Sequence, residues 1–469
     1  MSAGLAACGA CHDEMARHAG PAHEMLACDL CHRGDPSATD LPTAHRGLLA
    51  YPGDLANADQ TCGRCHADRT ASVRHNPMAH GDGMVRTTRL AWGQPWADSL
   101  LDKLCAGCHL ARPRNPSLPP AANRGGGCLA CHWAGPDRGI TARVGDERCF
   151  GCHARSGRIA LNYAGLAEVN GYGNEPVVGT LDDGRPVRRR PADSHHAAGL
   201  ACIDCHTATG LMGTAGLDIA CEDCHRNQAD RKTFPQWNAD ELKFRERIPF
   251  PADERTGFLV TGRTGTPLWN VQVSESDLIL HGKLDGLPRR IPVWTAESHA
   301  GAEDHANLSC SACHSQWAPQ CYGCHLRYAP EEEQWDHRLG RMTKGRWIEE
   351  RWDVESGLPA LGVNEQGQIV PVVPGMILSA EHPDWSEQRF RRRFAALSPH
   401  TTGKARGCDS CHGSRTALGL GSATGARGPD GLAVDAWVGR DGRGALRQEG
   451  SGVRPLSPEQ IEKLMKTLE

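Results

Sequence analysis

Regular alternation of apolar and polar positions is confined to two segments in the second half of the chain. Residues 258–273 and 277–280 alternate around Gly and Pro, which predicts short β-strands. Residues 361–375 predict a hairpin or a pair of extended strands. Residues 389–397 predict a short basic helix, and residues 457–468, with Pro458 near the start, predict an amphipathic C-terminal helix.

The use of cysteine adds a second and stronger pattern. The chain has 469 residues and 22 cysteines, and every cysteine belongs to a Cys-x-x-Cys-His unit. Eleven units account for all 22, so no thiol is left for a disulfide or a separate metal site. We number the motifs 1 to 11 in chain order, and their cysteines are Cys8 and Cys11, Cys28 and Cys31, Cys62 and Cys65, Cys105 and Cys108, Cys128 and Cys131, Cys149 and Cys152, Cys202 and Cys205, Cys221 and Cys224, Cys310 and Cys313, Cys321 and Cys324, and Cys408 and Cys411.

Two other classes of cysteine-rich protein are weighed against a haem protein. A secreted disulfide framework accepts any residue after the second cysteine. Zinc ribbons also use Cys-x-x-Cys pairs but need no histidine at the next position. Because histidine follows in every one of the eleven motifs, the pattern predicts eleven covalently attached c-type haems.

The spacing of the motif has a mechanical reason. On a helical turn, positions i, i+3 and i+4 share one face, so both sulfurs reach one edge of the porphyrin. The histidine then lies beneath the iron as the proximal ligand. The proximal candidates are His12, His32, His66, His109, His132, His153, His206, His225, His314, His325 and His412.

The composition agrees with a core that is built largely from cofactor. Aromatic residues make up only 5% and apolar residues 39% of the chain. Eleven porphyrins would supply the missing planar apolar mass. Cofactor binding would then contribute to the free energy of folding, and the haem-free chain is expected to be largely unfolded.

The uneven spacing of the motifs predicts the organisation of the chain. The predicted fold is mostly irregular, with short α-helices wrapped around a haem array and two minor β-rich insertions. The expected regions are a dense eight-haem region (1–226), a haem-free β-rich insertion (227–298), a two-haem segment (299–327), a second haem-poor insertion (328–407), and the last haem with a C-terminal tail and helix (408–469). The insertions are interpreted as packing elements, with a docking surface or a lid as the alternative.

Histidine is over-supplied beyond the motifs. Of 24 histidines, 13 lie outside the motifs, enough to give eleven irons a second histidine with two to spare. His281 lies in a strand-like apolar run and is the weakest of the thirteen. The remaining distal candidates are His18, His23, His45, His75, His80, His195, His196, His299, His305, His337, His382 and His400.

Some distal candidates carry a more specific expectation. His195 and His196, just before motif 7, are expected to point to opposite sides and to bind two different haems. His299 and His305 are expected to do the same around motifs 9 and 10. Met78 and Met84 are alternative distal ligands, although the supply of histidine makes them unnecessary.

Charge and hydropathy limit the kinds of molecule that the chain is expected to bind. The 52 basic residues include 44 arginines, which reflect either codon bias or the pairing of arginine with haem propionates. The net charge of −4 and the lack of a long basic stripe argue against nucleic-acid binding. The sequence contains no run of 18 apolar residues, so no membrane span is predicted.

Haem attachment also predicts the compartment. Covalent c-type haem is attached outside the cytoplasm, so the chain is expected in the periplasm or at the cell surface. No signal peptide precedes Cys8, and the expectation is that such a signal has been removed.

With these motifs the chain resembles the multihaem c-type cytochromes of respiratory bacteria. That group includes electron conduits, extracellular cytochrome filaments, and reductases related to hydroxylamine oxidoreductase and octahaem tetrathionate reductase. The resemblance covers residues 8–412 and implies closely packed haems in alternating parallel and perpendicular pairs. No Cys-x-x-Cys-Lys motif occurs, so the lysine-ligated haem of pentahaem nitrite reductases is not matched.

Three functions are open at this stage. The first is electron transfer along mostly bis-histidine haems, to redox partner proteins or extracellular acceptors, with no catalytic residue assigned. The second is a subunit of a polymeric cytochrome filament, in which the chain is its own partner. The third is a reductase of nitrogen or sulfur oxyanions at one five-coordinate haem.

Overall fold

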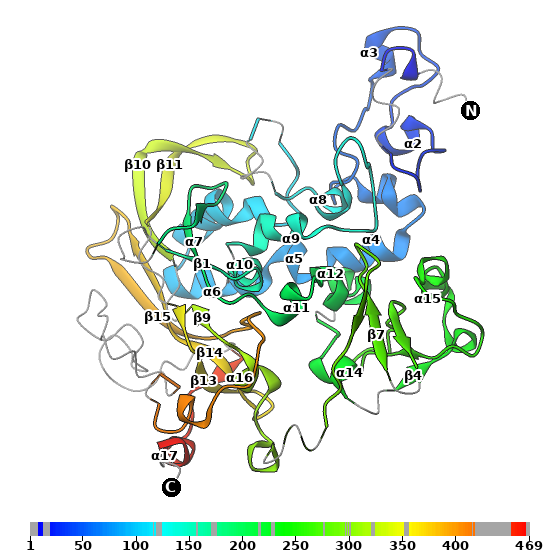
Figure 1. Cartoon of the computed structure of the whole chain (residues 1–469). Coiled ribbons are helices and arrows are strands. Elements are labelled where there is room, and N and C mark those ends of the chain that lie inside the picture. Colours follow the sequence, from blue (N-terminus) through cyan, green and yellow to red (C-terminus); the bar gives the residue numbers. More distant parts are fainter. Residues whose placement is uncertain are drawn as a thin grey trace.

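The computed structural model describes residues 8–12, 19–115, 117–118, 124–155, 158–169, 176–213, 217–226, 230–274, 277–295, 297, 299, 302–319, 324–350, 356–414, 416–417 and 452–465. Two of the predicted site residues, His18 and Cys321, lie outside these ranges. Within them the chain forms short helices and several small sheets (Figure 1).

The helices are short, and many consist of a single turn. Isolated helices of this length are marginal in water, so their stability must come from what they pack against. The α-helices are α2 (Cys28–His32), α3 (Leu41–Ala44), α4 (Ala67–Arg74), α5 (Pro77–His80), α6 (Asp82–Trp92), α7 (Trp96–Leu100), α8 (Cys128–His132), α9 (Asp146–His153), α10 (Ile159–Tyr163), α11 (Ser194–Ala197), α12 (Cys202–Cys205), α13 (Ala208–Met212), α14 (Cys221–His225), α15 (Ala239–Leu242), α16 (Cys310–His314) and α17 (Pro458–Met465).

Tighter or wider helical turns connect these elements. Leu101–Cys105 (η3) is a π-helical turn that continues α7 into motif 4. The 3₁₀ turns are η1 (Ala58–Gln60), η2 (Cys62–Arg64), η4 (Ala106–Cys108), η6 (Phe234–Gln236), η7 (Arg245–Arg247), η8 (Ala302–His305) and η9 (Cys408–Ser410). The predicted C-terminal amphipathic helix is confirmed as α17.

The short strands predicted at residues 258–273 and 277–280 are confirmed. β5 (Phe258–Leu259) pairs with β4 (Arg231–Lys232), while β6 (Val271–Val273), β7 (Leu278–His281) and β8 (Pro288–Arg290) form an antiparallel sheet in that order. A further small sheet, ordered β1-β3-β2, lies in the predicted eight-haem region and was not predicted. Its strands are β1 (Leu166–Glu168), β2 (Gly179–Thr180) and β3 (Pro186–Arg189).

The second insertion is larger than the minor element that was predicted. Its sheet has the order β11-β10-β14-β13-β16, with β15 paired to β14. The predicted hairpin is confirmed as β13 and β14, whose turn is held by the Asn364 side chain and by Gly367 at φ +81°. The strands are β10 (Cys324–Asp336), β11 (Arg341–Glu350), β13 (Ala360–Asn364), β14 (Ile369–Glu381), β15 (Arg389–Ala396) and β16 (Val453–Arg454), and a separate pair joins β9 (Ala318–Pro319) to β12 (Ser356–Gly357).

The predicted basic helix at residues 389–397 is wrong. These residues form β15, which pairs antiparallel with β14 from Ala396 opposite Val372 to Arg389 opposite Ala380. Local helix propensity is a weak preference, and the backbone hydrogen bonds offered by the free edge of β14 outweigh it.

Apolar burial is divided among small clusters. The largest surrounds Trp92 and Trp347 between α6, α7 and the β10–β11 hairpin, and another groups Phe234, Trp237, Phe250 and Phe258. In Figure 1 the N-terminal segment with α2 and α3 projects from one side, and the β10–β11 hairpin lies on the opposite side. Between them lie the short motif helices.

Candidate functional site

The cysteine motifs fold as helical turns, as predicted, in nearly every described case. α2, α8, α9, α14 and α16 each end at the motif histidine. In four other motifs the histidine N–H donates to the carbonyl of the first cysteine, at 2.8–3.0 Å. These bonds join His12 to Cys8, His66 to Cys62, His206 to Cys202 and His412 to Cys408.

Motif 10 is the exception. Cys324 and His325 begin strand β10 instead of ending a helical turn, so the predicted helical turn is wrong for these two residues. His325 is buried, and its Nδ1 lies 2.8 Å from Ser379 Oγ on the neighbouring strand β14. Pairing with β14 decides the backbone conformation here.

One cavity of about 4120 Å³ runs through the centre of the described structure. A pocket for a single drug-sized molecule measures about 300–1,000 Å³, so this space is several times larger. Its walls carry both cysteines of motifs 3 to 9 and 11, together with Cys31. They also carry the motif histidines His66, His109, His132, His153, His206, His225, His314 and His412, and the distal candidates His23, His195, His299, His305, His337 and His400.

Motif histidines face non-motif histidines in pairs of nearly constant separation. Among the described residues six such pairs have ring centres 6.0–6.4 Å apart, and each joins one predicted proximal ligand to one predicted distal ligand. The pairs are His12 with His45, His66 with His23, His225 with His195, His206 with His400, His314 with His299, and His412 with His305.

This separation fits two imidazoles on opposite sides of one iron. A first-row metal–imidazole bond is about 2 Å long, and the ring centre lies about 1.1 Å behind the nitrogen, so the ring centres would be about 6.2 Å apart. Direct stacking or a hydrogen bond between the rings would bring them closer. The constant gap therefore matches the thickness of a metal centre between the rings.

The other ring nitrogen of several candidates is already engaged. Nδ1 lies 2.7–2.9 Å from a carbonyl oxygen in His32, His45, His132, His225 and His314. A backbone carbonyl only accepts, so each Nδ1 carries a proton, and in the neutral imidazole the lone pair is then on Nε2. This arrangement orients metal-binding histidines in proteins.

His195 has a stronger anchor. Its Nδ1 lies 2.8 Å from Asp193 Oδ1, and this hydrogen bond raises the pKa of His195. Asp193 also caps α11 and accepts from the backbone N–H of Thr402. Sequence reasoning missed this carboxylate, although an Asp two residues before a histidine pair is a recognisable N-cap signal.

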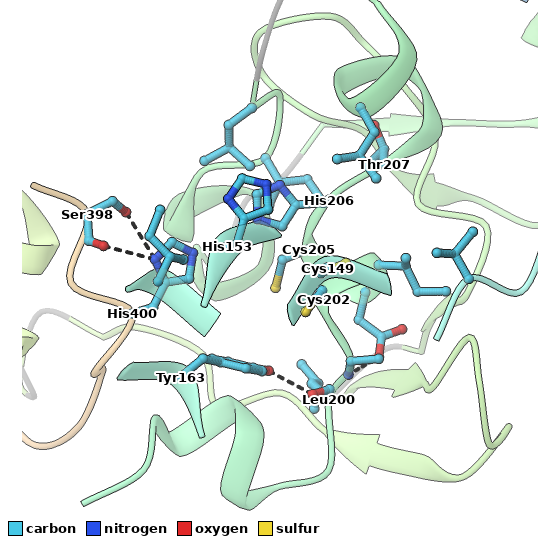
Figure 2. Close-up of a pocket in the computed structure, with 18 of the residues that line it drawn as sticks. Cys149, His153, Tyr163, Leu200, Cys202, Cys205, His206, Thr207, Ser398 and His400 are labelled. Atoms are coloured by element: carbon cyan, nitrogen blue, oxygen red, sulfur yellow. Dashed lines mark hydrogen bonds between the residues drawn. The ribbon is translucent and has the colours of Figure 1, made fainter. Parts of the chain in front are cut away.

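Burial keeps other imidazoles neutral, which is the form that binds iron. It lowers the pKa of His206 to about 4 and also lowers the pKa of His23 and His153. Figure 2 shows His153, His206 and His400 reaching into one part of the cavity, beside Cys149, Cys202 and Cys205. His400 adopts φ +52°, an uncommon backbone conformation for a residue other than glycine, and its Nδ1 is 3.1 Å from Ser398 O.

Several cavity arginines have unsatisfied groups. Arg124 Nη1, Arg148 Nε and Arg406 Nε are buried without a hydrogen-bond partner, and all three side chains line the cavity. Buried guanidinium nitrogens are normally paired, and a carboxylate is their preferred acceptor. The site therefore offers cationic donors of the kind that haem propionates require.

The remaining histidines have other surroundings. His382 packs among Tyr328, Trp347 and Trp385, and its Nδ1 accepts from the N–H of Asp384, so the predicted iron ligand lies in an aromatic cluster instead of facing a motif histidine. His281 Nε2 faces Gln272 Oε1 at 3.3 Å.

The adjacent pairs behave partly as expected. His195 faces motif 8, whereas the ring of His196 lies 5.1 Å from that of Tyr163. His299 faces motif 9, but His305 faces motif 11 and not motif 10.

Three other histidine candidates are not among the paired rings, and neither alternative methionine ligand faces a motif histidine in these pairs. His75 and His80 are exposed at the ends of α4 and α5. His337 lines the cavity, and the charge of His109 contributes to the lowering of its pKa, which is caused mainly by burial. Met78 and Met84 also line the cavity.

In the part of the chain that the structure describes, twenty cysteines are free thiols. Within the same residues, no group of three or more His, Cys, Asp or Glu side chains is arranged to hold a bare metal ion. No helix found there is long and apolar enough to cross a membrane.

Comparison with known proteins gives no relative: no family model, no curated protein and no solved structure matches the chain. The functional assignment therefore depends on the residues and geometry of this chain.

Proposed function

We propose that the chain is a multihaem c-type cytochrome that transfers electrons along eleven covalently attached, mostly bis-histidine haems. Each bound haem would supply an iron that alternates between the ferrous and ferric states and so carries one electron. The chain's own residues would attach the haem through two thioethers, fix both axial imidazoles and exclude water from the space between them.

The observation that carries this proposal is the set of six histidine pairs. Their ring centres are 6.0–6.4 Å apart, and each pair combines one motif histidine with one from elsewhere in the chain. Five of the six motif histidines in these pairs lie on the wall of one cavity. A protein that only stored haem would not need two strong ligands on opposite sides of each iron.

Two features support the attachment chemistry. The motif cysteines lie on helical turns that end at their histidine, which points both sulfurs and the imidazole to one side. The unpaired arginine nitrogens of the cavity wall would be satisfied by propionates. Because this attachment takes place outside the cytoplasm, we propose that the chain works in the periplasm or at the cell surface.

Electron paramagnetic resonance of the oxidised protein tests this function. Two strong axial ligands give low-spin ferric iron, so we expect low-spin signals to account for nearly all of the iron. A major high-spin ferric signal that shifts on addition of nitrite or hydroxylamine would instead support a reductase with an open iron site.

A further inference from the structure

Residues of different motifs meet at specific places. Three of the histidine pairs join one motif to the segment beside another. His12 of motif 1 faces His45, which follows motif 2, His66 of motif 3 faces His23, which precedes motif 2, and His225 of motif 8 faces His195, which precedes motif 7. These contacts show that motifs 1, 2 and 3 are neighbours and that motif 8 adjoins motif 7.

Packing places motif 5 between motifs 3 and 6. Cys128 and Ala130 of motif 5 pack in one apolar cluster with Ala58 and Val73, which lie on either side of motif 3 in the sequence. Helix α8, which carries motif 5, also contacts helix α9, which carries motif 6.

Hydrogen bonds connect further neighbouring motifs. Asp146, at the start of the motif 6 helix, accepts from the backbone N–H of Cys202 at 2.9 Å. The Cys310 thiol donates to Glu222 of motif 8 at 3.4 Å. Arg406 joins motifs 9 and 11, since its N–H donates to Cys313 O at 2.9 Å and its guanidinium to Cys411 Sγ at 2.7 Å.

Motif 4 is not part of this series of neighbouring motifs and contacts it at motif 6. Its Cys108 contacts Cys152 of motif 6 through a 3.8 Å hydrogen bond from Cys152 Sγ to Cys108 O. Asp146, on the same helix as motif 6, binds the backbone of motif 7. The motif 5 helix α8 contacts this helix as well. The helix α9, which carries motif 6, therefore adjoins three other motifs.

We propose that the haem-binding motifs form a branched relay with three ends. Its main path runs through motifs 1, 2, 3, 5, 6, 7, 8, 9 and 11, and motif 4 is a side branch from motif 6. The relay rests on the proposed function. An external one-electron donor is oxidised at one end and an external one-electron acceptor is reduced at another, and no bond is made or broken.

The branch gives the second β-rich insertion a role. Motif 4 follows η3, where the Lys103 ammonium donates to the carbonyls of Lys344 and Gly345 on β11. Asp102 forms ion pairs with Arg112 at 3.1 Å and with Arg338 at 2.8 Å, next to the β10–β11 turn. The hairpin is thereby fastened to the end of the branch, and motif 4 is the third point at which electrons enter or leave.

Film voltammetry on the haem-loaded full chain tests the relay. A tether at Leu41→Cys, 69% exposed in α3, attaches the protein to gold near motifs 1 and 2, and a tether at Met465→Cys, 43% exposed in α17, attaches it near motif 11. Two matched double variants each remove one haem. Cys128→Ala with Cys131→Ala breaks the main path at motif 5, and Cys105→Ala with Cys108→Ala removes the branch.

The charge passed at the electrode is compared with the haem content reduced by dithionite in solution. After the branch deletion we expect every haem of the main path to respond from either tether. After the break at motif 5, the haems of motifs 1, 2 and 3 should respond from the Leu41→Cys tether, and the haems of motifs 4, 6, 7, 8, 9 and 11 from the Met465→Cys tether.

A motif 5 variant that still exchanges its full charge from the first tether would overturn the order, as would a branch variant that disconnects other haems. The haem content of each variant, measured as pyridine haemochrome, shows that the remaining sites are filled. Wild-type chain without covalent haem would overturn the proposed function itself, so the two failures are distinguishable.

Discussion

At the residue scale, the angle between the two imidazole planes differs from pair to pair. The planes of His206 and His400 are 9° apart, whereas those of His12 and His45 are 81° apart and those of His305 and His412 are 84° apart. Parallel planes split two iron d orbitals that perpendicular planes leave nearly equal in energy. In the proposed cytochrome these two arrangements of the rings would give two kinds of low-spin ferric centre.

Replacing His400 with methionine tests this geometry. We expect His400→Met to remove one rhombic low-spin signal and to raise the reduction potential of one centre, because a thioether ligand favours ferrous iron. Paramagnetic resonance and a potentiometric titration measure the two effects. The matched control is His281→Gln, whose ring faces Gln272 and should leave the spectrum unchanged. An unaltered spectrum in His400→Met would exclude His400 as a ligand.

The sequence predicted which residues form the candidate site better than it predicted which of them face one another. The Cys-x-x-Cys-His spacing identifies the proximal histidines, and the surplus of histidine identifies a distal set. Which distal histidine faces which motif depends on contacts far apart in the chain, such as His400 with His206 and His305 with His412. His382 could not be separated from the other candidates, because only tertiary packing places it among aromatic rings.

At the element scale, a buried ion network positions the end of the motif 6 helix. The Arg185 side chain, just before β3, is 4% exposed, donates to the Ala154 carbonyl just after His153, and pairs with Glu168 on β1 at 2.8 Å. Arg158 also pairs with Glu168, at 2.7 Å. Burial alone would raise the pKa of Glu168, but the two arginines outweigh it and lower the pKa below 4.5.

Glu168→Gln should therefore destabilise the protein. Removing the carboxylate leaves Arg185 buried with less compensation, so we expect a loss of about 3–5 kcal/mol in the free energy of unfolding at neutral pH. The contribution of Glu168 is present above pH 4.5 and is lost as the pH falls through its lower folded-state pKa. Denaturant titrations of wild type and variant at several pH values measure this, and a difference that grows below pH 4.5 would contradict it.

The sequence predicted the elements that follow from a local pattern and missed those that form by pairing with a distant strand. Short strands at residues 258–281 and the hairpin at residues 360–381 follow from local alternation and turn residues. The strand at Arg389–Ala396 and the extended start of β10 at motif 10 do not, because both form by pairing with β14. Sheet pairing joins residues distant in sequence, which a local pattern does not show.

At the scale of the whole molecule, a large cavity replaces a continuous apolar core. The buried apolar residues form separate clusters around a space of about 4120 Å³. Protein interiors are close-packed, so side chains around a space of this size lack packing partners unless it is filled. This agrees with the low aromatic content of the chain.

The chain produced without haem attachment should therefore fail to fold. We expect low helix content by circular dichroism and rapid proteolysis throughout the chain, whereas the haem-loaded protein should resist protease. The two samples to compare are the same chain expressed with and without the enzymes that attach c-type haem. A haem-free chain with native helix content and protease resistance would show that the cavity is stable without cofactor.

The most direct test of the central claim is the number of covalent haems per chain, measured as pyridine haemochrome against protein concentration. We predict eleven, one for each Cys-x-x-Cys-His motif, with no thiol reacting with maleimide after denaturation. A value of ten, with the two maleimide-labelled thiols mapped to Cys321 and Cys324, would place the exception at motif 10, where His325 lies in a strand. Few or no haems, with most of the 22 cysteines reactive, would contradict the account.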